Sequence, residues 1–204
     1  MHVHGDTGLF KEGHMAEIQN QKLLYHLTDF SNLKAIFSEG LKPRSELSSF
    51  SDVADSDILD GRKALSLETK VPFHFFARNP FDGRVQQDHP DKEFVLIAVT
   101  REMAEANNWS VIPRHPLSSE KLELLEYKEG MEQINWTAMN QRDYQDEESK
   151  SVCMAECLSP STIEAKRFSN IFTPDSDLQK KVIKLKSEFK LGMYVNSNSN
   201  MFLT

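Results

Sequence analysis

One carboxylate stands in an apolar segment late in the chain, where an acidic side chain needs a chemical reason to be. Glu156 lies in the run MAECL, residues 154–158, within a stretch from residue 152 to residue 158 that predicts a β-strand. In such a strand Glu156 shares a face with Val152, Met154 and Leu158, where an unpaired carboxylate is costly. A glutamate in this setting has a cationic partner or lies in a ligand site, which makes Glu156 a candidate catalytic residue.

Two further segments carry side chains that could do chemistry. The first is the run YHLT at residues 25–28, followed by NLKAI at residues 32–36, and the second is VPFHF at residues 71–75, followed by Arg78. Taken singly, each has a structural explanation. A His-x-Thr at a strand end is more often a hydrogen-bonded pair than a site, VPFHF suits a core strand, and Arg78 suits a solvated turn. The order of the three segments along the chain is more informative than any one of them.

The elements that must position these residues can be predicted from apolar periodicity and turn residues. Strands are predicted at residues 22–27, 71–76, 94–99, 152–158 and 163–168, with possible short strands at residues 110–113 and 193–195. Helices are predicted from Asp29 or Ser31 to Gly40, from Ser118 through Leu122, Leu125 and Met131, from residue 134 to residue 144, and from Asp177 to Phe189. Residues 42–69 form a long excursion, and residues 79–91 carry turn chemistry. Strands and short helices without a strict βαβ rhythm predict an α+β fold with antiparallel pairing.

The bulk properties bound the class of protein. The chain has 204 residues with 39% hydrophobic content, which suits one domain at residues 21–204. Residues 1–20 are polar without a sustained period and predict a disordered or artificially appended leader. No apolar run approaches the roughly 20 residues that span a bilayer, so we expect a cytoplasmic protein that does not enter membranes. Cys153 and Cys157, four residues apart in a predicted strand, are expected to be reduced thiols.

Charge and motifs exclude several functions. The net charge of −7 argues against a protein that coats nucleic acid non-specifically, although a local basic groove remains possible. The eight Gly residues form neither a Rossmann nor a P-loop pattern, so a bound nucleotide needs another scaffold. The seven His residues show no HExxH spacing and the Cys pair no CxxC spacing, so we expect no metal site.

Together the three segments resemble the DarT family, toxins that transfer ADP-ribose from NAD to bases of DNA. Its pattern opens with Tyr-His-(Ile/Leu)-Thr, Asn-Leu-x-x-Ile and Gly-Leu, matched here by residues 25–28, 32–36 and 40–41. Its middle reads Val-Pro-Phe-Tyr-Phe and then Arg-Ser-Pro-Met, matched by residues 71–75 and 78–81, with His74 in place of the Tyr. Its catalytic Ala-Glu-Phe-Leu is matched by residues 155–158, and an upstream Asp-Trp by Asn135-Trp136. The resemblance covers about residues 23–172.

The resemblance implies an ADP-ribosyltransferase fold, a split and mainly antiparallel β-core with flanking helices that binds NAD as substrate. It implies Glu156 as the catalytic carboxylate and Arg62, at the end of the long excursion, as its partner; Arg44 or Lys63 are alternative counterparts of this arginine. His26, Thr28, Asn32 and Phe75 would contact NAD, with Phe75 stacked on the nicotinamide. Residues 143–154 would form the substrate-recognition loop, and Arg78, Arg142 and Lys150 would meet DNA phosphates.

The acceptor implied by the resemblance is single-stranded DNA, because a base inside a duplex cannot reach such a site. The stretch from residue 101 to residue 150 is acidic for that task, so an RNA or protein acceptor stays open, as does a non-catalytic nucleotide-binding module of the same fold. Membership of the family also implies a toxin–antitoxin system, in which a DarG-like macrodomain antitoxin removes the mark.

Overall fold

The computed structural model of the protein describes residues 17–48, 50–51, 66–116 and 124–203. In these ranges one sheet has the strand order β4-β5-β2-β1-β3-β6-β7, and only β6 and β7 pair in parallel. The strands are β1 Leu23–Asp29, β2 Val71–His74, β3 Phe94–Thr100, β4 Ser110–Ile112, β5 Glu156–Ser159, β6 Asn170–Thr173 and β7 Tyr194–Ser197. The predicted α+β class with mainly antiparallel pairing is confirmed.

The sheet is nearly divided between β1 and β2. β1 pairs with β3 along its whole length, from Leu23 opposite Thr100 to Asp29 opposite Phe94. Its ladder with β2 is a single pair, Tyr25 opposite His74. The sheet therefore has two halves, β4-β5-β2 and β1-β3-β6-β7, joined at that pair, as a split β-core requires.

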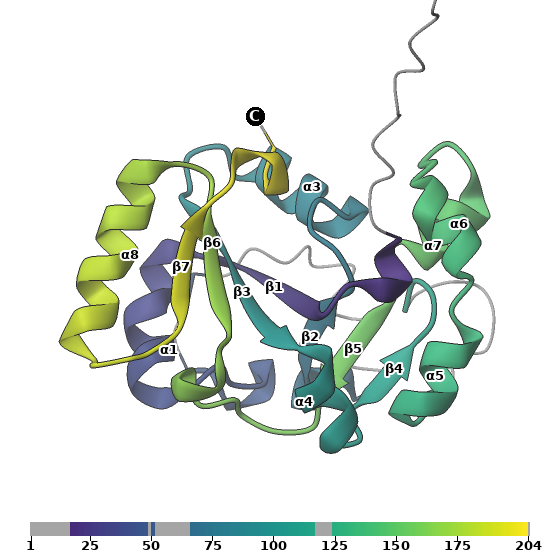
Figure 1. Ribbon diagram of the computed structural model, residues 1–204, viewed down its shortest axis with the longest axis horizontal. Coiled ribbons are helices and arrows are strands. Elements are labelled where there is room, and N and C mark those ends of the chain that lie inside the picture. The colour runs from purple at the N-terminus through teal and green to yellow at the C-terminus, as the bar shows by residue number, and fades with distance from the viewer. Residues whose placement is uncertain (1–16, 49, 52–65, 117–123, 204) are drawn as a thin grey trace, which may run out of the picture.

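Helices flank both halves of the sheet, as Figure 1 shows, with α1 and α8 beside the β6–β7 edge and α5, α6 and α7 beside β4 and β5. Their bounds are α1 Leu33–Glu39, α3 Pro80–Asp88, α4 Arg101–Ala106, α5 Tyr127–Gln133, α6 Trp136–Gln141, α7 Glu147–Val152 and α8 Ser176–Glu188. Short 3₁₀ turns lie at Ile18–Asn20, Phe30–Asn32, Arg44–Glu46, Leu67–Thr69, Ala165–Arg167 and Ser199–Met201. None of the described helices is long and apolar enough to cross a membrane.

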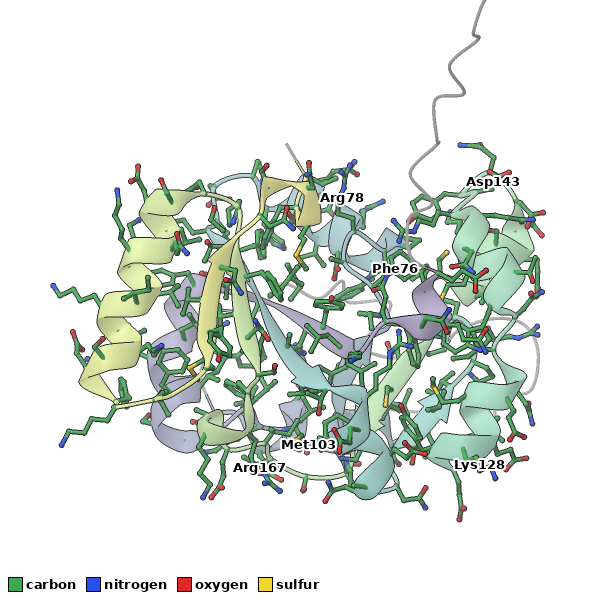
Figure 2. The ribbon with its side chains drawn as sticks, in the orientation of Figure 1. Phe76, Arg78, Met103, Lys128, Asp143 and Arg167 are labelled. Carbon is green, nitrogen blue, oxygen red and sulfur yellow. The ribbon has the colours of Figure 1, made fainter. Side chains whose placement is uncertain are left out.

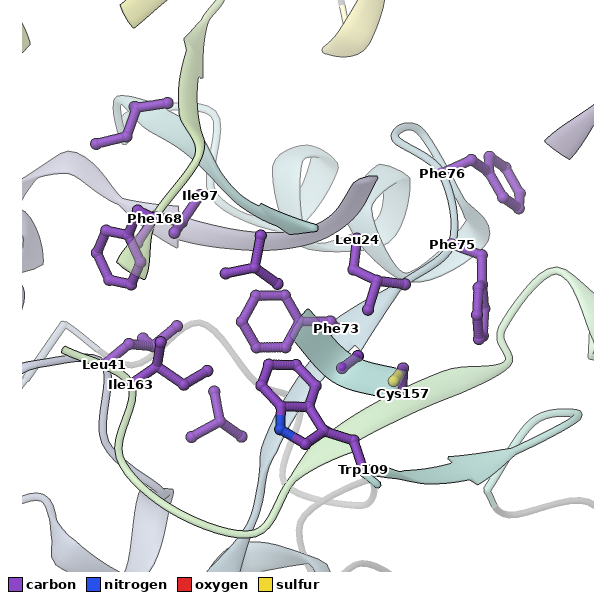
Figure 3. Close-up of a cluster of buried hydrophobic side chains, with 14 of the residues drawn as sticks. Leu24, Leu41, Phe73, Phe75, Phe76, Ile97, Trp109, Cys157, Ile163 and Phe168 are labelled. Carbon is purple, nitrogen blue, oxygen red and sulfur yellow. The ribbon is translucent and has the colours of Figure 1, made fainter. Parts of the chain in front are cut away.

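The main core lies on one face of the sheet and is built from alternate residues of neighbouring strands. Phe73 and Cys157 are directly opposite each other in β2 and β5, and both are fully buried. Trp109 lies against Phe73, with ring centroids 5.4 Å apart, and Figure 3 shows this pair near Leu24. Every residue of β3 from Phe94 to Val99 is buried, as its unbroken apolar run predicts.

Two predicted strands are wrong in part. Residues 152–155 do not belong to a strand, because Val152 ends α7 and β5 begins at Glu156. The acidic residues 146–148 begin that helix, where the Asp146 carboxylate accepts the N–H of Ser149 and the negative charges suit a helix N-terminus. The strand predicted at residues 163–168 is a β-bridge at Ile163 and a 3₁₀ turn, and β6 starts only at Asn170.

Several helix predictions also need correction. Residues 80–88 form α3 rather than turns, and the short helix α4 was not predicted. Leu125, which we predict to be helical, instead pairs with Val111 in a β-bridge, and α5 begins only at Tyr127. Ser118 and Leu122 lie outside the described residues. The last helix is capped by Asp175 and not by Asp177, because the Asp175 carboxylate accepts the N–H groups of Asp177 and Leu178.

The folded part of the chain includes residues that we assigned to the leader. Ile18 is buried in the main core, and its N–H donates to the Asn140 side chain at 2.8 Å. The carbonyl of Gln19 accepts from the Arg101 guanidinium at 3.0 Å. The boundary therefore lies no later than residue 17, and residues 1–16 are outside the described part.

Candidate active site

The candidate catalytic carboxylate lies beside the division of the sheet. Glu156 is the first residue of β5, directly opposite His74 of β2 and Ile112 of β4. His74 is in turn opposite Tyr25 of β1, so these side chains form one cross-strand row on one face. Glu156 is only 6% exposed. A carboxylate so placed can act on a substrate bound at the division without competition from bulk water.

The predicted NAD-binding histidine bridges the two halves of the sheet. The ring nitrogen Nδ1 of His26 lies 2.8 Å from the carbonyl oxygen of Pro72, on the other half. Because a carbonyl can only accept, Nδ1 carries the proton and the tautomer is fixed. The ring also lies 5.7 Å from that of Phe73, centroid to centroid. His26 is therefore held in one orientation, as a ligand-binding side chain should be.

Thr28 and Asn32 form a network with the loop that follows α1. The Asn32 amide donates to the Thr28 hydroxyl at 3.3 Å and to the Ser51 carbonyl at 3.1 Å. Its own oxygen accepts the Ser51 N–H at 2.8 Å. Asn32 thus ties the described part of the long excursion to the strand that carries His26 and Thr28.

An ion pair between Asp29 and Lys92 binds Ser51 and so supports this network. The Ser51 hydroxyl donates to the Asp29 carboxylate at 2.7 Å and accepts from the Lys92 ammonium at 2.8 Å, while Lys92 lies 3.8 Å from Asp29. Burial raises the pKa of Asp29, but hydrogen bonds from Ser51 and Ser31 and the Lys92 charge outweigh it, so that the pKa lies below its ordinary value. The carboxylate stays ionised at neutral pH and keeps the loop attached. Sequence reasoning proposed Asp29 only as a helix cap and missed Ser51 and Lys92.

For the NAD site that the resemblance implies, replacing Asn32 with alanine is expected to raise the KM for NAD about tenfold, because Thr28 and Ser51 lose hydrogen bonds worth roughly 1 kcal/mol each. Asn32 makes no side-chain cap bond to α1, so the helix should be unaffected. Ser38→Ala is the matched control, since Ser38 lies in α1, which Asn32 precedes, with an exposed hydroxyl bound to the Ala35 carbonyl. Steady-state kinetics on both variants measures the effect. An Asn32→Ala enzyme with the control's KM would show that this network does not shape the NAD site.

Phe75 does not lie where a nicotinamide could stack on it. The side chain is 1% exposed, with Trp136 against its edge at 5.6 Å and the Arg101 guanidinium 5.2 Å from its centroid. Arg101 also donates to the Phe75 carbonyl at 3.1 Å. At 1% exposure the ring leaves no room for a stacked ligand, so the predicted stacking is wrong and Phe75 is a core residue.

The structure brings two of the three predicted DNA-contacting residues together. The Tyr144 hydroxyl donates to the Arg78 carbonyl at 3.1 Å, and the Arg142 guanidinium lies 4.8 Å over the ring of Phe76. Burial raises the pKa of Tyr144 to about 12, so this hydroxyl keeps its proton. Figure 2 places Arg78 near α3 and Asp143 at the tip of the α6–α7 pair, on the same edge in that view. Lys150 is exposed on α7.

Arg78 and Arg142 share an uncommon backbone conformation. Their φ angles are 59° and 50°, in the left-handed region that costs a non-glycine residue free energy. Such strain concentrates at functional sites, where the surrounding structure holds it. Both arginines thus occupy strained backbone positions, and the Tyr144 hydroxyl binds the carbonyl of one of them, Arg78.

The predicted catalytic arginine, Arg62, lies outside the described residues, as does its alternative Lys63. The other alternative, Arg44, lies in the 3₁₀ turn Arg44–Glu46, with its guanidinium 5.0 Å over the ring of Phe50. In the part of the chain that the structure describes, no group of three or more His, Cys, Asp and Glu side chains could hold a metal ion.

Comparison with known proteins gives the family. A family model described as "ssDNA thymidine ADP-ribosyltransferase, DarT" matches residues 25–203. Thermus sp. 2.9 DarT in complex with ADP-ribosylated ssDNA is similar at a TM-score of 0.77 and 18% identity, over 89% of this chain and 96% of that one. The same protein in complex with NAD+ is similar at a TM-score of 0.72 and 16% identity, over 89% of this chain and 97% of that one. Thermosipho africanus DarTG in complex with ADP-ribose is similar at a TM-score of 0.73 and 22% identity, over 89% of this chain and 51% of that one. No curated protein matches the chain.

Proposed function

This chain belongs to the DarT family, and from that premise we propose that it transfers ADP-ribose from NAD to a thymidine base of single-stranded DNA, with Glu156 as the catalytic carboxylate. The observation that carries the proposal is the place of Glu156. It is more than nine-tenths buried at the first position of β5, in the row that crosses the division of the sheet. The matched range also contains His26, Thr28 and Asn32.

The reaction breaks the bond between C1′ of the ribose and the nicotinamide nitrogen, and the electron pair leaves with nicotinamide. Positive charge develops on the ribose, so a carboxylate beside it stabilises the transition state more than the ground state. Thymine has one ring nitrogen that carries a hydrogen, N3. N3 bonds to C1′, and Glu156 takes the N3 proton, a role worth about 10²- to 10⁴-fold.

The remaining residues hold the two substrates. His26, oriented by the bond from Nδ1 to Pro72, contacts NAD in this proposal, and Thr28 and Asn32 form the adjoining wall. The guanidinium groups of Arg78 and Arg142, with Lys150, bind phosphates of the DNA strand, because cationic side chains near phosphates release counterions. The target base must be unstacked to reach Glu156, which favours a single strand as acceptor.

Mass spectrometry of short oligonucleotides incubated with the protein and NAD tests the proposal. We expect one added ADP-ribose on single-stranded DNA that contains thymidine. We expect none on the matched oligonucleotide without thymidine or on the duplex. Modification of an RNA oligonucleotide or of protein instead would overturn the assigned acceptor, and no transfer to any of them with no loss of NAD would leave a nucleotide-binding module.

Arg62 is proposed as the residue that orients the NAD phosphates, because a guanidinium binds phosphate in bidentate fashion. Arg62→Ala is expected to weaken NAD binding about tenfold or more, measured by calorimetry with Arg44→Ala as the paired control. A loss in Arg44→Ala alone would mean that Arg44, stacked on Phe50, is the phosphate-binding arginine.

An enzyme that spends NAD to modify DNA must be restrained by its host. One similar chain is Thermosipho africanus DarTG, and the match with the present chain covers 51% of the length of that chain. We therefore assign to this protein the role of a toxin that acts in the cytoplasm, where NAD and DNA are found, with a DarG-like macrodomain protein as its antitoxin. Co-expression tests this role, because growth should stop with the enzyme alone and resume with the macrodomain.

A further inference from the structure

His74 is the cross-strand neighbour of the proposed catalytic carboxylate. It ends β2 directly opposite Glu156, the first residue of β5. Residues paired in this way direct their side chains to the same face, with Cβ atoms about 5 Å apart. Both side chains are more than nine-tenths buried, at 5% and 6% exposure. Whatever fixes the His74 ring therefore acts in the immediate surroundings of Glu156.

Two of its contacts help to fix that ring. Its Nδ1 lies 3.2 Å from the carbonyl oxygen of Ala155, the residue that precedes Glu156. Since a carbonyl can only accept, Nδ1 carries the proton and donates. The ring of Phe81, from α3, lies 5.4 Å away and tilted by 32°. The imidazole is thus held between a helix on one side and the backbone of the catalytic strand on the other.

The backbone before Glu156 is held by hydrogen bonds within its own turn and by the burial of Cys153 and Ala155 in the main core. Cys153 and Met154 follow the end of α7, and the turn closes with the Ala155 N–H bound to the Val152 carbonyl at 3.0 Å. Regular pairing with β2 starts only at Glu156. The Ala155 carbonyl accepts from His74, so this hydrogen bond ties the entry of β5 to the end of β2.

We propose that His74 is a positioning residue that clamps the entry to β5 through its Nδ1–H bond to Ala155 and so aims the Glu156 carboxylate. This inference rests on the proposed function for its kinetic consequence, because a displacement of about 1 Å in a catalytic group costs on the order of 10²-fold in rate. The side chain acts through the backbone and does not itself bind NAD. Its loss should lower kcat and leave the KM for NAD nearly unchanged.

Three variants separate the clamp from simple packing. His74→Phe keeps the ring against Phe81 and removes both nitrogens. His74→Asn restores a donor at the position of Nδ1, whereas His74→Gln places its amide where Nε2 lies. With a thymidine oligonucleotide as acceptor, we expect His74→Phe to lower kcat about 10²-fold with less than about a threefold change in KM. We expect His74→Asn to recover at least about tenfold of this loss and His74→Gln to recover none.

Amide hydrogen exchange in β5 gives a readout independent of activity. The peptide that spans residues 156–159 should exchange faster in His74→Phe and His74→Gln than in the natural protein and His74→Asn. A His74→Phe enzyme with full kcat, or rescue by His74→Gln alone, would overturn the clamp. If the natural protein modifies no oligonucleotide but the exchange pattern holds, the clamp stands and the proposed function fails. If the natural protein is active and exchange is equal in all variants, the clamp fails and the proposed function stands.

Discussion

Glu156→Gln is expected to lower the rate of ADP-ribose transfer by about 10³-fold or more. Glutamine keeps the size of the side chain but carries no negative charge for the ribose in the transition state and cannot take the proton of the attacking nitrogen. The loss should appear in kcat, measured in single-turnover reactions with NAD and a thymidine oligonucleotide. NAD affinity should change only a few-fold, because the charge is needed chiefly in the transition state.

Glu164→Gln is the matched control for this prediction. Glu164 lies eight residues further along, is exposed, and pairs with Lys166 at 2.6 Å on the surface. Its replacement should leave transfer within about a factor of two, since exposed ion pairs contribute little. Undiminished transfer by Glu156→Gln would place the chemistry on another residue.

Asp82→Asn is expected to remove a steep loss of stability with rising pH. Asp82 is buried at the start of α3, where its Oδ2 accepts from the Asn79 amide at 2.8 Å, while Oδ1 has no hydrogen-bond partner within the described part. Burial raises its pKa to about 8, and the nearby backbone of Arg78 and the Asn79 side chain offset this only partly. The folded protein therefore keeps this carboxyl protonated at pH 7, whereas the unfolded chain does not.

The sign of the effect follows from that difference. From the ordinary pKa of 3.8 up to about 8 the folded state holds one more proton, so stability falls as pH rises, by about 1.4 kcal/mol per pH unit. Between pH 5 and pH 7 the natural protein should lose about 3 kcal/mol of its free energy of unfolding through Asp82. The Asp82→Asn variant should not show this loss. Urea denaturation at both pH values measures this. Asp88→Asn, at an exposed pair with Arg84, should keep the natural pH dependence. Equal slopes for all three proteins would show that Asp82 ionises normally.

The fold could be predicted where one local signal dominated. The apolar run of residues 94–99 is short and carries Val95, Ile97 and Val99, which favours a strand buried on both faces, and β3 is that strand. After β1, Asp29 caps the 3₁₀ turn that leads into α1, and α1 ends at Gly40, whose φ of 90° suits glycine. In each place the local signals agree with one another, so one sequence was enough.

Elsewhere a weaker local signal was misjudged. The segment Asn79-Pro80-Phe81-Asp82 looked like a turn because of its Asn, Pro and Asp, yet the same residues form a helix start with Asn79 as N-cap and proline at the first turn. Apolar residues before Glu156 suggested a strand, but Val152 is buried at the end of a helix. An apolar residue reports burial, and burial alone does not distinguish helix from strand.

Some residues of the candidate site could likewise be predicted from the sequence, and others could not. Glu156 could be found because a carboxylate in an apolar run is costly and thus conspicuous. Phe75 was misplaced because a core aromatic and a stacking aromatic look the same in a sequence. The link from Lys92 to Ser51 and Asp29 joins residues 41 and 63 positions apart, and no local pattern reports such a contact.

A crystal structure of the Glu156→Gln variant with NAD and a thymidine oligonucleotide tests the central claim most directly. We predict the residue 156 side chain within about 4 Å of both C1′ of the nicotinamide ribose and N3 of an unstacked thymine, the near-attack geometry that the reaction requires. Nicotinamide ribose bound away from the start of β5, with residue 156 touching neither atom, would contradict it.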